Sequence, residues 1–403
     1  MDYHQTDDAV TRRIKAMTDR ISKLQENGLY FYNQAVEEML GDSKVRVRGR
    51  VMGMYASYGY LGLLGHPRIN AAAKAAVDKF GTGTNGVRTL AGTLTLHNEL
   101  EETIANFKHT EAAITYSSGY ATNLTVVSTL MGRGDYVFSD KLNHASIVDG
   151  CLMSGAEFRR FRHNDMVHLE GLLKNAPADV AKLVIADSVF SMDGDIINLP
   201  KMAALCKKYN AWLMIDEAHS LGVLGNTGTG IEEHFDLYGA IDIKMGTLSK
   251  TIPSVGGYVA ASKDIITYLR HASRAYIFSA ALPPAQAAAA NEAFKVILDE
   301  PERIVKLNLN TKQFIGGLKS MGFDTMLTET AIVPVLCGDD DTAFAVTRES
   351  QLNDVFVLPV VSPAVPEGLA RLRATVTAAH DPSEIERAMD VIGEAGKKLG
   401  LIK

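Results

Sequence analysis

Cysteine is scarce in this chain of 403 residues, which contains only Cys151, Cys206 and Cys337. Because their number is odd and they lie far apart, they favour reduced thiols in a cytosol-like compartment over a disulfide framework. The eleven histidines and three cysteines form no metal-ligand pattern, so no metal site is expected. No run approaches about 18 consecutive apolar residues, and the first residues lack the basic and apolar blocks of a signal peptide. We therefore expect a cytoplasmic protein without an integral membrane segment.

A strong charge of one sign is also missing. The formal net charge is −6, from 41 basic and 47 acidic residues, which gives no electrostatic case for nucleic acid or an anionic membrane as a partner. Apolar residues make up 46% of the chain and charged residues 22%, as in ordinary globular proteins. The length is sufficient for two or more domains with sizeable cores.

Apolar segments of strand type alternate with helical patterns between about residues 55 and 285. Strands are expected at 112–116, 135–139, 183–187, 212–216 and 241–246, and helices at 97–107, 121–131, 165–174 and 199–209. Strands separated by helices in this way predict a parallel sheet covered on both faces, and therefore an α/β fold.

Three domains are expected. They are an N-terminal helical arm (1–55), a large domain (56–288) and a smaller C-terminal α+β domain (289–403). The last contains a long helical stretch at 290–320, short strands at 331–336, 355–358 and 371–376, and a closing helix at 382–398.

The segment from Met214 to Lys250 carries the most specific chemistry. An apolar run ends at Asp216 and is followed by His219. A second strand pattern is followed by Lys250, which lies in a loop of small residues. A pyridoxal phosphate (PLP) site needs this set: a carboxylate for the pyridine nitrogen, a hydrogen-bond donor for the phenolic oxygen and an amine for a Schiff base. The alternative is a strand-end acid, a surface histidine and one lysine among many.

Other chemically suitable side chains follow the remaining strands, and ligands bind at the carboxyl ends of parallel strands. Ser118, Gly119 and Tyr120 open a helix, where free backbone N–H groups suit a phosphate, although simple helix capping is the alternative. The other candidates in such positions are His144, Ser191 and Thr247, each of which could instead be an ordinary loop residue. Near the C-terminus, Arg371 and Arg373 share one strand face, and one of them could grip a carboxylate unless both form surface ion pairs.

Taken together, these motifs resemble the α-oxoamine synthases, a family of fold-type-I PLP enzymes. The resemblance covers nearly the whole chain, and its most specific parts are Asn143-His-Ala-Ser146 and Phe190-Ser-Met-Asp-Gly-Asp195. It implies a large domain with a mostly parallel seven-stranded sheet, a smaller C-terminal domain and an N-terminal helical arm. It also implies a homodimer.

The resemblance further implies a role for each candidate residue. Lys250 would form the Schiff base with PLP and later remove the Cα proton of the substrate. Asp216 would pair with the pyridinium, His219 and Ser191 would hold the phenolic oxygen, and His144 would stack on the ring. The phosphate would be bound by Ser118, Gly119, Tyr120 and Thr247, and by Ser279 of the neighbouring subunit. Arg373, Tyr58 and His144 would contact the amino acid.

The implied reaction joins a small amino acid (serine, alanine or glycine) to an acyl thioester, with release of CO₂ and coenzyme A. Some segments, such as Pro359–Pro366, look most like bacterial serine palmitoyltransferases, which favours serine and a medium or long acyl chain. Others, such as Arg371–His380, look more like 8-amino-7-oxononanoate synthase or 2-amino-3-ketobutyrate CoA ligase. An acyl donor on a carrier protein, an aminotransferase and a non-catalytic partner-binding protein are the remaining alternatives.

Overall fold

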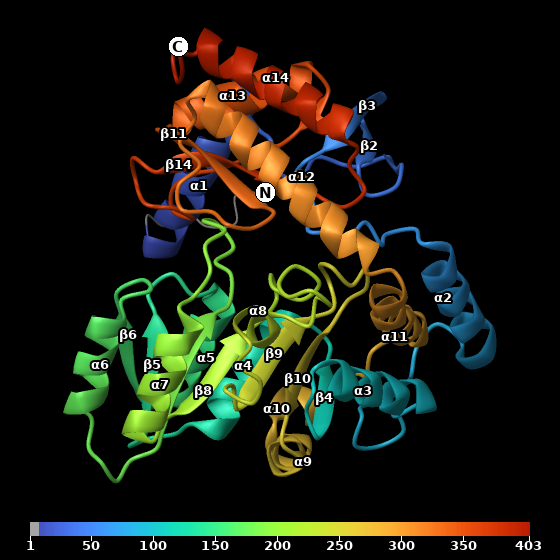
Figure 1. Ribbon diagram of the computed structural model, residues 1–403, viewed down its shortest axis with the longest axis vertical. Coiled ribbons are helices and arrows are strands. Elements are labelled where there is room, and N and C mark those ends of the chain that lie inside the picture. Colours follow the sequence, from blue (N-terminus) through green and yellow to red (C-terminus); the bar gives the residue numbers. More distant parts are fainter. Residues whose placement is uncertain (1–7) are drawn as a thin grey trace.

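The computed structural model describes residues 8–403, and its largest sheet, in the lower half of Figure 1, has seven strands in the order β4-β10-β9-β8-β7-β5-β6. The strands are β4 (Ala112–Tyr116), β5 (Tyr136–Asp140), β6 (Glu157–Phe161), β7 (Lys182–Asp187), β8 (Trp212–Asp216), β9 (Ile243–Thr247) and β10 (Gly257–Ala261). Only β10 runs against its neighbours, and the other six strands share one direction. The expected mostly parallel seven-stranded sheet is thereby confirmed.

Helices cover both faces of this sheet. Successive residues of each strand point to opposite faces, and apolar residues on both faces need to be buried. On β8, Leu213 and Ile215 belong to one buried apolar cluster, whereas Met214 belongs to another on the opposite face. The covering helices are α3 (Thr95–Phe107), α4 (Gly119–Leu130), α5 (Ala145–Ser154), α6 (Met166–Asn175), α7 (Leu199–Tyr209), α8 (Ile231–Phe235), α9 (Lys263–Ala272) and α10 (Arg274–Ile277). All the expected strands and helices of this part are present, with bounds shifted by a few residues at most.

The C-terminal part is built from three antiparallel strands, β11 (Ile332–Gly338), β14 (Ala370–Thr375) and β13 (Leu358–Val360), with α13 (Asp340–Leu352) and α14 (Pro382–Lys398) beside them. The expected single helical stretch at 290–320 is wrong. Two helices occupy it, α11 (Pro284–Asp299) and α12 (Glu302–Met321), because Pro301 offers no backbone N–H to continue the first. Helix α11 packs on α2 (Pro67–Phe80) and runs across the expected boundary at residue 288, so the division into domains stays a prediction.

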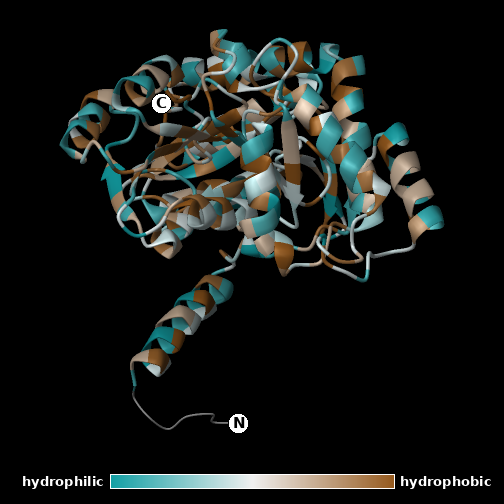
Figure 2. Ribbon diagram, turned by 90° about the horizontal axis from the view of Figure 1, so that it is seen from below, coloured by the Kyte–Doolittle hydropathy of each residue, from teal (hydrophilic) through white to brown (hydrophobic). Residues whose placement is uncertain are grey.

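The N-terminal segment is helical only in part. Helix α1 (Ala9–Glu26) has no buried residue and extends away from the body of the molecule (Figure 2). The prediction of a helical arm through residue 55 is wrong beyond it, since β1 (Glu38–Met39), β2 (Lys44–Val47) and β3 (Arg50–Met54) follow. These strands form a second sheet with β12 (Val355–Phe356), so the segment after α1 is joined to the C-terminal part. Within residues 8–403, no helix is both long and apolar enough to cross a membrane.

Candidate active site

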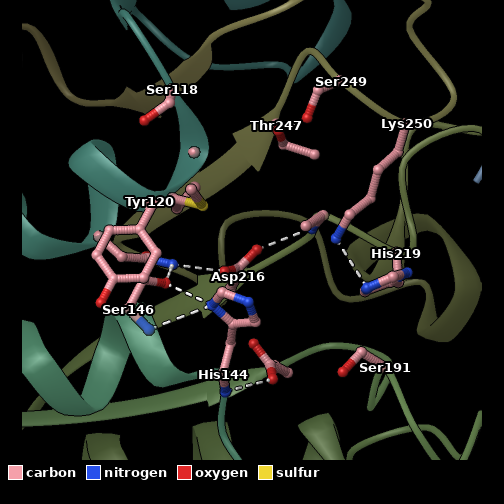
Figure 3. Close-up of a pocket in the computed structure, with 15 residues that line it drawn as sticks. Ser118, Tyr120, His144, Ser146, Ser191, Asp216, His219, Thr247, Ser249 and Lys250 are labelled. Carbon is pink, nitrogen blue, oxygen red and sulfur yellow. Dashed lines mark hydrogen bonds between the residues drawn. The ribbon is translucent and has the colours of Figure 1, made fainter. Parts of the chain in front are cut away.

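The sequence-predicted residues gather where the parallel strands end. A cavity of about 270 Å³ lies at the carboxyl ends of β4, β5, β7, β8 and β9, as Figure 3 shows. Its walls are formed by Ser118, Gly119, Tyr120, Asn123, His144, Ser146, Asp187, Ser191, Asp216, Ala218, His219, Met245, Thr247, Ser249 and Lys250. Nine of the predicted residues therefore share one cavity, although their positions span more than 130 residues of sequence.

Lys250 and His219 are directly joined. The Lys250 Nζ lies 2.7 Å from Nε2 of His219, whose Nδ1 lies 2.6 Å from the hydroxyl of Tyr60. Burial lowers the pKa of Lys250 to about 8, against the attraction of Asp216 and Asp187. Burial, helped by the charge of Lys250, also holds the pKa of His219 well below its usual range. The histidine is therefore neutral at pH 7, and about a tenth of the Lys250 amine is unprotonated at that pH and available as a base.

Asp216 is fixed at the end of β8 by two donors. The side-chain amide of Asn123 donates to Oδ2 at 2.7 Å, and the backbone N–H of Ala218 donates to Oδ1 at 2.9 Å. The carboxylate is buried and faces the same cavity as Lys250 (Figure 3). These two hydrogen bonds hold the Asp216 carboxylate in one orientation, which a carboxylate needs in order to pair with a ring nitrogen.

His144 lies at the N-terminus of α5, with its ring in the cavity (Figure 3). Its backbone N–H donates to Oδ2 of Asp187 at 3.0 Å, and its Nδ1 lies 2.7 Å from the hydroxyl of Ser146. Burial lowers the pKa of His144, so the ring is neutral at pH 7. Burial and the nearby charge of Asp216 raise the pKa of Asp187 well above its usual value. A neutral ring, held at Nδ1 and carried on a backbone that is bonded to Asp187, suits contact with the face of a planar group.

An anion would fit the opposite end of the cavity. Ser118 caps α4 and accepts from the N–H of Ala121 at 3.1 Å, which leaves the N–H groups of the first helical residues for a ligand. A Cβ added to Gly119 would lie 3.0 Å from Oγ1 of Thr247, so glycine favours the close approach of these two segments. That hydroxyl also lies 2.9 Å from Oγ of Ser249. Backbone N–H groups and three hydroxyls form a cradle of the kind that binds phosphate.

Arg373 reaches the same region from β14. Its Nε donates to the backbone oxygen of Ser191 at 2.7 Å, and its Nη1 donates to Thr375 at 2.9 Å. Its Nη2 is buried without an aligned hydrogen-bond partner. The ring of Tyr58 lies 4.7 Å from its Cζ and 5.5 Å from Nζ of Lys250. Arg371, in contrast, is paired with Asp193 at 2.7 Å, so Arg373 is the better candidate to bind a ligand carboxylate.

Ser279, like Arg373 and Tyr58, does not line this cavity. It is partly buried between the exposed Phe278 and Ala280, which pairs with Val87. A role toward the cofactor of a neighbouring subunit stays a prediction.

Several cavity residues were missed by the sequence analysis. They are Asn123, Ser146, Asp187 and Ser249, together with Tyr60 behind His219. Asn123 and Ser146 lie near the N-termini of α4 and α5, so their position beside predicted strand ends was an available signal.

The Lys250 amine should show its lowered pKa when apoprotein takes up PLP. Only the neutral amine attacks an aldehyde, so we expect the rate of uptake to rise roughly 20-fold between pH 6.5 and 8.5 and then to level off. Stopped-flow absorbance measures this rate, with N-acetyl-lysine methylamide as the reference amine whose rate still rises above pH 9. A protein rate that follows the reference to pH 10 would contradict the assignment.

Comparison with known proteins agrees with this geometry. The sequence pattern of the family described as aminotransferase class I and II matches residues 55–392. The chain is 44% identical to 8-amino-7-oxononanoate synthase 1 of Bacillus velezensis over 95% of its length and 97% of the relative's. It is also 44% identical to 8-amino-7-oxononanoate synthase of Geobacter sulfurreducens, over 96% and 100% of the two chains.

Among solved structures, a serine palmitoyltransferase from S. paucimobilis with a bound PLP–myriocin aldimine superposes with a TM-score of 0.95. The two chains are 36% identical, and the match covers 98% of this chain and 100% of the other. The 8-amino-7-oxononanoate synthase from Francisella tularensis gives a TM-score of 0.73 at 27% identity, covering 85% of this chain and 97% of that one.

Proposed function

We propose that this chain, which belongs to the aminotransferase class I and II family and within it to the α-oxoamine synthases, makes 8-amino-7-oxononanoate or a close analogue. It is a PLP-dependent acyltransferase that uses an amino acid and an acyl thioester. The sequence analysis put serine palmitoyltransferase first, but the relatives fit its alternative better, because those at 44% identity are 8-amino-7-oxononanoate synthases. These relatives also disfavour an aminotransferase and a non-catalytic protein.

The name of that product specifies the substrates. Its ninth carbon is a methyl group beside the carbon that carries the amine, so these two carbons match alanine after loss of its carboxylate. The other seven carbons, ending in a carboxylate, come from the acyl group of a dicarboxylic acid monothioester. We therefore propose alanine as the amino acid, with CO₂ and the free thiol as the other products.

The cavity residues fit PLP and this reaction. PLP, when bound, supplies a cationic ring that accepts the electrons left at Cα. Asp216 would hold the ring nitrogen, and His219 and Ser191 the phenolic oxygen. Ser118, Gly119, Tyr120 and Thr247 would hold the phosphate. The single observation that carries the proposal is the common cavity of Lys250, His144 and Asp216.

The chain's own side chains supply the remaining steps. Arg373 would bind the substrate carboxylate through its unpartnered Nη2, with Tyr58 beside it. Lys250, with its lowered pKa, would take the proton from Cα, and the neutral His144 would contact the ring face and help orient the carboxylate. Cα, once it has lost its proton, would bond to the acyl carbon while the C–S bond breaks and the thiolate leaves with a proton. The bond from Cα to the carboxylate would then break to release CO₂, and a proton would take its place at Cα to give the amino ketone.

A second candidate is condensation of serine with a longer acyl thioester. It is favoured by the TM-score of 0.95 to serine palmitoyltransferase, which exceeds the 0.73 to the synthase from Francisella tularensis. The chain architecture is therefore nearer to that serine palmitoyltransferase, whereas the sequence is nearer to the 8-amino-7-oxononanoate synthases at 44% identity.

The deciding experiment crosses alanine, serine and glycine with heptanedioyl-CoA and palmitoyl-CoA and identifies products by mass spectrometry. We expect alanine with heptanedioyl-CoA to give the highest kcat/KM, by about tenfold or more over serine, because one added hydroxyl changes binding by about 1–3 kcal/mol. A palmitoyl preference with serine would establish the second candidate instead. Repeating the assay with the heptanedioyl group on a carrier protein decides between the two thioesters.

We also propose a homodimer in a reducing compartment such as the cytoplasm. The support for the dimer is Ser279, which lies outside its own cavity beside Phe278, whose side chain is 74% exposed. The support for the compartment is that all three cysteines are free. Native mass spectrometry of the holoprotein tests the dimer.

A further inference from the structure

His163 lies outside the cavity and bridges two carboxylates. Its Nδ1 lies 3.0 Å from Oδ1 of Asp140, and its Nε2 lies 2.9 Å from Oδ2 of Asp195. The side chain of Asp140 is fully buried, and that of Asp195 is 9% exposed. Burial lowers the pKa of His163, but the bonds to the two carboxylates outweigh it and raise the pKa to about 10. The imidazole is therefore a cation that donates from both nitrogens.

The carboxylate on one side of this bridge anchors the segment that carries His144. Oδ1 of Asp140 accepts the N–H of Leu142 at 2.8 Å, and Oδ2 accepts the N–H of Asn164 at 2.8 Å. The segment from Asp140 at the end of β5 to His144 at the start of α5 is only five residues long. A shift of Asp140 would therefore move the imidazole that faces the cofactor.

The carboxylate on the other side anchors the turn from Phe190 to Asp195. Within the turn, the N–H of Phe190 donates to the backbone oxygen of Asp195 at 3.1 Å, and Gly194 donates back to Phe190 at 2.8 Å. The imidazole of His163 also meets the ring of Phe190 edge to face, with centroids 4.3 Å apart. The bridge therefore holds both the backbone end of the turn and its aromatic side chain.

This turn determines the direction of Arg373. The backbone oxygen of Ser191 accepts Nε of Arg373 at 2.7 Å, and one face of the guanidinium lies over Tyr58. Gly194 fixes the turn from behind, because it has a φ of +74° and an added Cβ would lie 2.2 Å from the backbone oxygen of Ile332. The turn is therefore packed closely at Gly194 and bonded to His163 at Asp195.

We propose that His163 is a positioning residue, whose cation ties Asp140 to Asp195 and thereby sets where Arg373 and His144 meet the carboxylate of the amino acid. This inference rests on the proposed function, since it assumes that Arg373 binds that carboxylate. His163 itself does not line the cavity that holds the cofactor residues.

The test is the variant His163→Phe, which keeps an aromatic ring against Phe190 but removes both donors and the charge. We expect the holoprotein to retain PLP, while its dissociation constant for alanine rises about 10- to 100-fold, because small displacements of a binding group have effects of this size. The readout is the change in cofactor absorbance on titration with alanine, without an acyl donor; serine and glycine are titrated in parallel.

The matched control is His168→Phe, five residues along the chain. Nδ1 of His168 accepts the N–H of Arg162 at 2.9 Å, so this variant loses a neighbouring histidine contact but leaves the bridge intact. It should lose thermal stability without weakening alanine binding. His163→Gln, which keeps one donor, should lie between the wild type and His163→Phe.

Alanine affinity within twofold of the wild type in a folded His163→Phe protein would overturn the inference, as would an equal loss in the control. If His163→Phe does not fold, His163→Gln and Asp195→Asn decide by the same criterion. Failure of the proposed function would look different. The wild-type holoprotein would then bind none of the three amino acids or yield no amino ketone.

Discussion

Lys250→Ala is expected to lower turnover by at least about 10⁴-fold, the effect of removing a residue that acts as both nucleophile and base. The expected loss is large because no other amine can take over. Among residues 8–403, Lys250 is the only lysine that lines the cavity, and its Nζ already contacts His219. Turnover is measured as amino ketone by mass spectrometry. Treatment with borohydride followed by peptide mapping should couple PLP to residue 250 in the wild type and nowhere in the variant.

PLP should remain in the variant without a covalent link, because Asp216, His144 and the phosphate cradle are untouched. Lys263→Ala is the matched control, since that lysine is exposed at the start of α9 and should be dispensable. Turnover of Lys250→Ala above about one hundredth of the wild type would place the nucleophile and base elsewhere.

The site residues that the sequence predicted are those that directly follow a recognisable strand pattern. An apolar run of strand length ends at Asp216, and β8 covers the expected residues 212–216 without change. The candidates after β5, β7 and β9 were found by the same rule, because parallel strands bring their carboxyl ends to one edge. The family resemblance then gave each residue a role that pattern alone could not supply.

The parts that could not be predicted depend on contacts between distant segments. Tyr60 bonds to His219 across 159 positions, and no period in the sequence signals this. The same applies to β3, whose partner β12 is about 300 residues away. The strands β1 and β2 are short and contain both apolar and charged residues, so they lack a clear strand pattern. The helical arm was therefore predicted to continue beyond the end of α1.

The position of His163 shows the limit of pattern analysis most clearly. From sequence it is assigned no role, because it is one of eleven histidines in the chain. The structure shows that Asp140 and Asp195, from different strand ends, converge on it. The two carboxylates raise the pKa of His163 to about 10, well above the usual value of about 6.5. This shift depends on residues that are distant in sequence, so no local segment could indicate it.

Arg373→Ala is expected to raise KM for the amino acid roughly 100-fold, the loss of a charged hydrogen-bonding partner worth about 3 kcal/mol. KM for the acyl thioester should change little, because the guanidinium is assigned to the amino-acid carboxylate alone. Steady-state kinetics with each substrate varied in turn separate the two effects. The PLP content and melting temperature of the variant show whether the site is still assembled.

Arg373→Lys separates charge from geometry at this position. Lysine keeps the positive charge, but it cannot donate from a planar fork to Ser191, Thr375 and a carboxylate together. If the fork matters, this variant should recover only a small part of the affinity lost in Arg373→Ala. Full recovery would mean that charge alone attracts the substrate, and an unchanged KM in both variants would move the carboxylate site away from β14. Since Arg371 on the same strand face is already paired with Asp193, the carboxylate would then have to be bound from another segment.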